Sequence, residues 1–127
     1  MKLTLEPQDF LTSFTENFNS GELDRVMAGY TSDAILNPGG GNLLHGPEQI
    51  RGAIQNFLAP KLPIVVSAIS QTTAGDTSIV IFEWRIEGNG PDGSRVELSG
   101  RAVDVIRKGG DGVWRQVIDL PFGSATV

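Results

Sequence analysis

Two aspartates in the second half of this sequence could act as acids, bases or hydrogen-bond donors. Asp104 lies within an apolar segment, and Asp119 follows the apolar residues of the last such segment. Burial raises the pKa of an unpaired carboxyl group, and shifted carboxyl groups concentrate at functional sites. We therefore predict that Asp104 is an acid or hydrogen-bond donor, with Asp119 as a candidate partner in a carboxylate pair. The alternative is that Asp104 is a structural carboxylate bonded to a hydroxyl, a tryptophan N–H or an arginine.

Three further side chains are candidates for catalysis. His45, the single histidine, has an ordinary pKa near neutrality, so it is either a general base or an exposed loop residue. Asn37 precedes a proline, so it either binds a ligand carbonyl or caps its own turn. Tyr30 either offers its hydroxyl to a ligand or is a core residue with its OH at the edge.

The composition argues against metal and cofactor chemistry. The chain has no cysteine and one histidine, which excludes disulfides, thiolate zinc sites and a multi-histidine site. The glycines at 39–41 lack the spacing of a phosphate-binding loop. A His-carboxylate metal site stays open but has no spacing motif behind it, so we expect neither a metal nor an organic cofactor.

Charge and hydropathy limit the partners. The net charge is −5 and no block of basic residues occurs, which disfavours nucleic acid and an anionic membrane surface. The longest apolar stretches, such as residues 62–66, are too short to span a bilayer, and the N-terminus lacks the apolar run of a signal peptide. We therefore expect a cytoplasmic protein without a membrane partner.

Helical periodicity dominates the first half of the chain. Phe10, Leu11, Phe14 and Phe18 recur at helical spacing after Pro7 and before the stop signal at 19–21. A second short helix is predicted with Leu23, Val26, Met27 and Tyr30 on its apolar side. An extended piece at 34–37 leads into a Pro-Gly loop at 38–41, and a third helix is predicted to open at 46–48 and close at Pro60.

The second half alternates as β-strands do. Strands are predicted at 64–73, 78–87, 95–107 and 113–120, joined by turns rich in glycine and aspartate. Short turns between consecutive strands predict an antiparallel meander. We therefore predict one α+β domain over residues 1–127, with the N-terminal helices packed in the concave face of a curved antiparallel sheet.

Some strands are apolar on both faces. Val103 and Val105 alternate with Ala102 and Ile106, whereas a sheet with one wet face would need polar residues on that side. The outer face should therefore be covered, and we predict a homodimer packed through the sheets.

Segments of both halves resemble the SnoaL-like and ketosteroid-isomerase-like families of the nuclear transport factor two-like superfamily. The likeness rests on FNSGELD at 18–24, YTSDA at 30–34, GPEQIR at 46–51, GRAVDVIR at 100–107, and DGVWR at 111–115 followed by Asp119. The resemblance implies the α+β cone fold and a pocket for a small apolar molecule. This fold hosts isomerases, cyclases, hydrolases, dehydratases and non-catalytic adaptors, so it does not imply one activity.

The resemblance also assigns positions. Ketosteroid isomerase uses a carboxylate base, and it binds the developing oxyanion with a tyrosine and a protonated aspartic acid. The oxyanion aspartic acid falls on Asp104, the tyrosine on Phe14 and the base on Asn37. Phenylalanine has no hydroxyl and asparagine is not a base, so steroid isomerisation by that mechanism is not expected.

We therefore hold two hypotheses for the function. In the first, the chain binds an apolar ring compound and acts as a cofactor-free acid–base enzyme through Asp104, helped by Asn37, Tyr30 or His45. In the second, it is a non-catalytic dimeric association module with a filled pocket. Epoxide hydrolysis by an Asp-Arg-Asp arrangement is a third idea, for which Arg101 lies on the wrong strand face and Arg85 stays open. The residues expected to line the pocket are Phe14, Phe18, Phe57, Phe82, Trp84 and Asp119.

Overall fold

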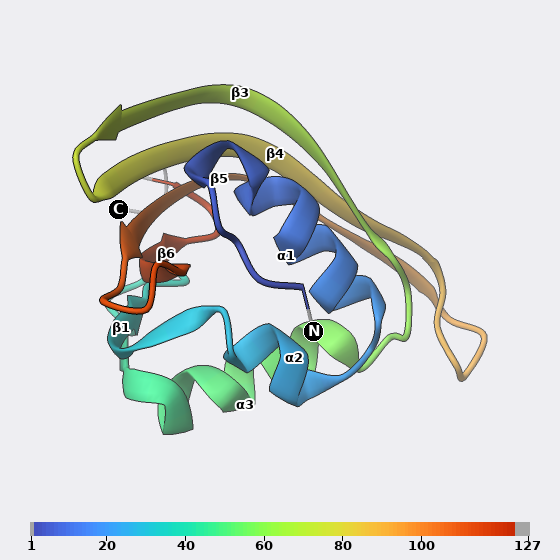
Figure 1. The fold of residues 1–127 in the computed structure, drawn as a ribbon. Coiled ribbons are helices and arrows are strands. Elements are labelled where there is room, and N and C mark those ends of the chain that lie inside the picture. Colours follow the sequence, from blue (N-terminus) through green and yellow to red (C-terminus); the bar gives the residue numbers. More distant parts are fainter. Residues whose placement is uncertain (1, 124–127) are drawn as a thin grey trace.

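The computed structural model describes residues 2–123 as three helices and a short 3-10 turn packed against one six-stranded sheet. The elements in chain order are η1 Pro7–Asp9, α1 Phe10–Asn19, α2 Leu23–Met27, β1 Tyr30–Leu36, β2 Leu44–His45, α3 Gly46–Leu58, β3 Ile64–Ala74, β4 Thr77–Asn89, β5 Arg95–Lys108 and β6 Trp114–Leu120. The strand order is β2-β1-β6-β5-β4-β3. The long strands β3, β4 and β5 curve over the helices, as Figure 1 shows. The predicted α+β architecture is confirmed.

The alternation of side chains on β4 and β5 places the core on the helix side of the sheet. Val80, Phe82, Trp84 and Ile86 are buried, while Glu83, Arg85 and Glu87, which alternate with them, are exposed. Helix α1 contributes Phe10 and Phe18 to the same core, and α3 contributes Ile50 and Ile54. The inward face of the sheet is therefore the wall of one continuous core.

The sheet is mixed rather than wholly antiparallel, because β1 runs parallel to β6. The prediction that Tyr30 lies on the second helix is wrong. Helix α2 ends at Met27, and Tyr30 is the first residue of β1, paired in register with Gln116. The Gln116 backbone N–H donates to the Gly29 carbonyl at 2.8 Å, so strand pairing replaces the next helical turn. The short strand β2, which the sequence did not predict, pairs antiparallel with the end of β1.

No helix within residues 2–123 has the length and apolar character that crossing a membrane requires.

Candidate active site

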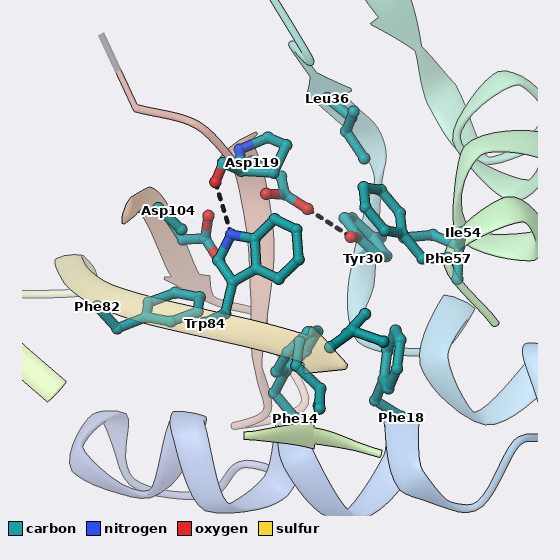
Figure 2. A pocket seen from close by; sticks show the side chains of 14 residues that line it. Phe14, Phe18, Tyr30, Leu36, Ile54, Phe57, Phe82, Trp84, Asp104 and Asp119 are labelled. Carbon is teal, nitrogen blue, oxygen red and sulfur yellow. Dashed lines mark hydrogen bonds between the residues drawn. The ribbon is translucent and has the colours of Figure 1, made fainter. Parts of the chain in front are cut away.

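A narrow cavity of about 40 Å³ lies between the helices and the concave face of the sheet. It has space for a few water molecules, since one water occupies roughly 10–15 Å³ on this measure. Its wall is apolar except at one end, where Tyr30, Asp104 and Asp119 meet, as Figure 2 shows. The remaining lining residues are Phe14, Phe18, Leu36, Ile54, Phe57, Ile64, Phe82, Trp84, Ile86, Ala102 and Pro121.

Strand register brings the two aspartates together. Asp104 of β5 is paired directly with Asp119 of β6 in the antiparallel ladder, so both side chains project to the same face. That face is the concave one, since Asp104 alternates with the buried residues Ala102 and Ile106. Asp104 is 2% exposed and Asp119 is 8% exposed. Two carboxyl groups are therefore held next to each other in an apolar environment.

Tyr30 reaches the pair from the far end of the chain. Its hydroxyl donates to Asp119 Oδ2 at 2.5 Å, a buried hydrogen bond between residues 89 positions apart. The parallel pairing of β1 with β6 makes this contact, because it sets Tyr30 beside the strand that carries Asp119. The donated proton points at Asp119, so the phenol that lines this end of the cavity supports the carboxylate.

The environment assigns the proton of the pair to Asp104. Burial, the neighbouring Asp119 charge and a hydrogen bond to Asp119 raise the pKa of Asp104 well above its usual range. Burial also raises the pKa of Asp119, but hydrogen bonds from Asp104 and Tyr30 oppose that rise. Burial and the Asp119 charge raise the pKa of Tyr30 as well. We conclude that Asp104 is the acid of the pair and Asp119 its carboxylate.

One oxygen of the pair is unused. Asp104 Oδ1 is buried and has no hydrogen-bond partner within residues 2–123. The Leu120 backbone N–H donates to the Asp104 carboxyl group, which opposes part of the rise in pKa. A buried polar atom without a partner is costly, about 1–3 kcal/mol, and it is where a ligand or a water would bind.

Gln116 belongs to this network and was not identified from the sequence. It is 1% exposed on β6, and its side-chain amide donates a hydrogen bond that lowers the pKa of Tyr30. Since the phenol oxygen accepts from Gln116, its own proton is directed to Asp119. The sequence does contain a feature that could have identified it. Gln116 lies two residues after Trp114 in the same strand, and this spacing puts both side chains on the buried face.

Asn37 and His45 lie elsewhere. Neither is among the residues that line the cavity within the described chain. Asn37 Oδ1 accepts the Gly39 backbone N–H at 2.9 Å, so the side chain caps its own turn. His45 is exposed at the start of α3, where its backbone N–H donates to Gln49 Oε1 at 2.7 Å. The geometry thus joins Asp104 to Tyr30 and Asp119, but not to these two residues.

No arginine among residues 2–123 lies beside the Asp104–Asp119 pair. Arg101 and Arg85 are exposed and lie 3.5 Å from Glu83 and 3.3 Å from Glu87, respectively. The inward position two residues before Asp104 is Ala102. An Asp-Arg-Asp arrangement is therefore absent among residues 2–123. Within the same range, no group of three His, Cys, Asp or Glu side chains could hold a metal ion.

Comparison with known proteins gives one family match and several similar structures. A model of the SnoaL-like domain matches residues 11–117. No curated protein matches the chain. Among solved structures, a ketosteroid isomerase-like protein from Erwinia carotovora is 16% identical, with a TM-score of 0.75 and 89% of each chain covered.

Two further structures show how varied the names are within this fold. A protein from Streptomyces avermitilis described as a dehydratase of the NTF2-like family is 18% identical, with a TM-score of 0.71 and coverage of 87% of this chain and 88% of that one. A protein from Xanthomonas campestris described as a calcium/calmodulin dependent protein kinase II association domain is 17% identical, with a TM-score of 0.75 and coverage of 93% and 86%. At these identities the likeness establishes the shared fold and not a shared activity.

Proposed function

Since the chain belongs to the SnoaL-like domain family, we propose that its cavity binds a small apolar ring compound and that the Asp104–Asp119 pair performs acid–base chemistry on it. One observation carries the proposal: two buried carboxyl groups, paired in strand register, lie at the end of an apolar cavity, with Asp104 Oδ1 unpartnered. Apolar residues at both positions would favour folding more than two buried carboxyl groups do, so the presence of the pair favours a role in function.

The bare oxygen suggests the class of ligand. With the proton of the pair held between the carboxyl groups, Asp104 Oδ1 is an acceptor and matches an O–H donor. A ring compound with one hydroxyl group would pack its ring against the apolar wall and donate a hydrogen bond from its hydroxyl to Asp104 Oδ1. Asp104 Oδ1 can accept a proton from the ligand as the shared proton moves onto Asp119, and it can return a proton to another ligand atom as the shared proton moves back, so that the pair ends as it began, as isomerisation or dehydration requires. Phe14 lines the cavity without a hydroxyl, so Tyr30 and Asp119 support Asp104 rather than forming the usual oxyanion site.

A comparison of two compounds in thermal unfolding tests this proposal. 2-Naphthol has a hydroxyl group, and naphthalene is the matched compound without it. We expect 2-naphthol to raise the melting temperature, since a ligand at 100 times its Kd stabilises by about 2.7 kcal/mol. Asp104→Leu should lose the preference for 2-naphthol because the acceptor is gone, whereas Asp104→Asn should keep it. The exposed residue Asp76 provides the control Asp76→Asn, which should behave as the wild type. Equal binding of both compounds to the wild type, or binding of neither, would refute the proposal.

An association module is the second candidate, favoured by the narrow cavity and by the convex face of the sheet. Ile79 of β4, Val105 of β5 and Ile118 of β6 are register partners and form an aliphatic row across that face. Ile79 is 45% exposed and Ile118 is 36% exposed. The next outward-facing row, Ile81 of β4 and Val103 of β5, continues the apolar surface as far as the Glu83–Arg101 ion pair. We propose a homodimer through this face, which is compatible with either function.

Sedimentation velocity tests the dimer. Wild-type protein is expected to sediment as a dimer and Ile79→Lys as a monomer, because a lysine in the aliphatic row would leave a charge buried in the interface. Leu43→Lys is the matched control, since Leu43 is equally exposed but lies in the loop before β2. A wild-type monomer, or a dimer that survives Ile79→Lys, would contradict this interface.

A further inference from the structure

The turn that follows β6 forms part of the wall at the polar end of the cavity. Leu120, Pro121, Phe122 and Gly123 form this 120–123 turn, in which the Gly123 N–H donates to the Leu120 carbonyl at 3.0 Å. Gly123 has a φ of 65°, a conformation that glycine adopts without strain. Pro121 lines the cavity. The turn begins one residue after Asp119, so it lies next to the carboxylate pair.

Trp84 fastens this turn to the sheet. Its indole Nε1–H donates to the Pro121 carbonyl at 2.7 Å in a buried hydrogen bond, which Figure 2 draws beside both carboxyl groups. The Phe122 ring packs on the same indole with centroids 5.6 Å apart, and Phe57 of α3 meets it edge-on at 5.7 Å. Trp84 therefore touches the turn, the helix layer and the cavity at once.

Gly100 makes room for this contact. It is the register partner of Trp84 on β5, and a Cβ atom there would lie 2.7 Å from the Pro121 carbonyl oxygen and 2.8 Å from Trp84 Nε1. Both distances are below any real Cβ contact, and one of the two atoms is backbone. The turn can therefore occupy its observed position only because residue 100 has no side chain.

The cavity as observed is too small for the proposed ligand. Its volume of about 40 Å³ compares with roughly 300 Å³ or more for pockets that hold drug-sized molecules. Asp104 is 2% exposed, so no ligand reaches it without movement of the wall. Pro121, Phe122 and Gly123 lie outside the strand ladder, whereas the wall residues Phe82, Trp84 and Ile86 lie in β4, which is paired on both sides. Segments outside a ladder open at lower free energy than paired strands.

We propose that the 120–123 turn is the gate of the cavity and that Trp84, seated against Gly100, is the residue that controls ligand entry. This inference rests on the proposed ligand-binding function. Opening breaks the Trp84–Pro121 hydrogen bond, exposes the carboxylate pair from its Pro121 side and enlarges the cavity, with the rest of β4 and β5 in place.

Hydrogen exchange of the Trp84 indole N–H tests the gate without any ligand. In the native protein this proton should exchange through local opening, with a free energy below that of global unfolding and almost no dependence on low concentrations of urea. The backbone N–H groups at the centre of β4 should follow global unfolding. Trp114→Phe assigns the indole signal, because the chain has two tryptophans. An indole that exchanges only with global unfolding overturns the gate.

Gly100→Ala should hold the gate open. The added Cβ displaces the Pro121 carbonyl, so we expect indole exchange to accelerate by about 10-fold or more, the equivalent of about 1.4 kcal/mol. Gly52→Ala is the matched control, since nothing lies within 4 Å of a Cβ there. Unchanged exchange in Gly100→Ala would contradict the proposal.

A second variant keeps the test decisive if Gly100→Ala does not fold. Trp84→Phe retains an aromatic ring but removes the hydrogen bond to the Pro121 carbonyl. In stopped-flow measurements this variant should bind 2-naphthol about 10-fold faster than the wild type, because a hydrogen bond worth about 1.4 kcal/mol is lost. An unchanged association rate overturns the gate. Failure of 2-naphthol to bind any variant contradicts the proposed function instead, and leaves the exchange result to decide the gate.

Discussion

Asp104→Asn is expected to be more stable than the wild-type protein at pH 7 and inactive in proton transfer. The folded-state pKa of Asp104 is raised by burial and by Asp119, so folding disfavours its ionisation. The stability that the protonated acid provides is fully present below the unfolded pKa of about 3.9 and is lost as pH rises towards the folded pKa. The slope is about 1.4 kcal/mol per pH unit, which sets a ceiling of about 4 kcal/mol at pH 7.

Asparagine removes that loss because its amide mimics the protonated acid. The side-chain N–H₂ can donate to Asp119 as the acid does, and it cannot ionise. Urea unfolding from pH 4 to pH 8 should show a gap between variant and wild type that grows with pH and closes near pH 4. Asp92→Asn, at an exposed turn where a hydrogen bond from Ser94 lowers the aspartate pKa, should be less stable than the wild type at pH 7. An Asp104→Asn variant that is less stable than the wild type at pH 7 would show that Asp104 is ionised in the folded state.

Tyr30→Phe is expected to destabilise the protein by about 1.5–3 kcal/mol at pH 7, the usual contribution of a hydrogen bond to a charged group. The ring stays, but Asp119 loses the 2.5 Å hydrogen bond that helps to keep it ionised. Its pKa then rises further, so stability falls more steeply above the unfolded pKa. The difference from the wild type should therefore be smaller at about pH 3, where both aspartates are mostly protonated in the folded and unfolded states. The lower of the two pH values in the measurement is therefore about 3.

Urea unfolding at the two pH values measures this effect. Thr15→Val is the matched control, because the buried Thr15 hydroxyl has no partner among residues 2–123; its removal should leave stability unchanged or raise it, with the same effect at both pH values. A double-mutant cycle of Tyr30→Phe with Asp119→Asn should show coupling of about 0.5–3 kcal/mol. Additive effects would mean that the hydroxyl does not support the carboxylate.

Local sequence signals predicted most of the fold. The spacing of the aromatic residues on α1, Pro47 at the start of α3 and the glycine turns between β3, β4, β5 and β6 each correspond to an observed element. These features are decided within a few residues of chain, where helix periodicity, proline geometry and turn chemistry act. The resemblance to SnoaL-like proteins added the arrangement of the layers, and the family match agrees with it.

The site was less accessible from sequence because it depends on pairing between distant segments. Tyr30 continues the helical spacing of Leu23, Val26 and Met27, yet its parallel pairing with Gln116 decides its structure. The register of β5 and β6 places Asp104 opposite Asp119, and it includes a shift between Val105 and Ile106. The alternation of apolar and polar residues along a strand does not reveal where such a shift occurs. The volume of the cavity depends on how the aromatic rings fill it, and composition carries no information on that.

The parallel pairing of β1 with β6 also has a consequence for synthesis and folding. Tyr30 emerges from the ribosome early and Asp119 near the end, so their contact closes a loop of 89 positions. The hairpins of β3, β4 and β5 need only neighbouring residues and can form first. Until β6 docks, Asp104 lies on an unpaired strand edge without its carboxylate partner. A partly synthesised chain would therefore contain the acid but no assembled centre, and completion of the sheet is the step that creates the chemistry.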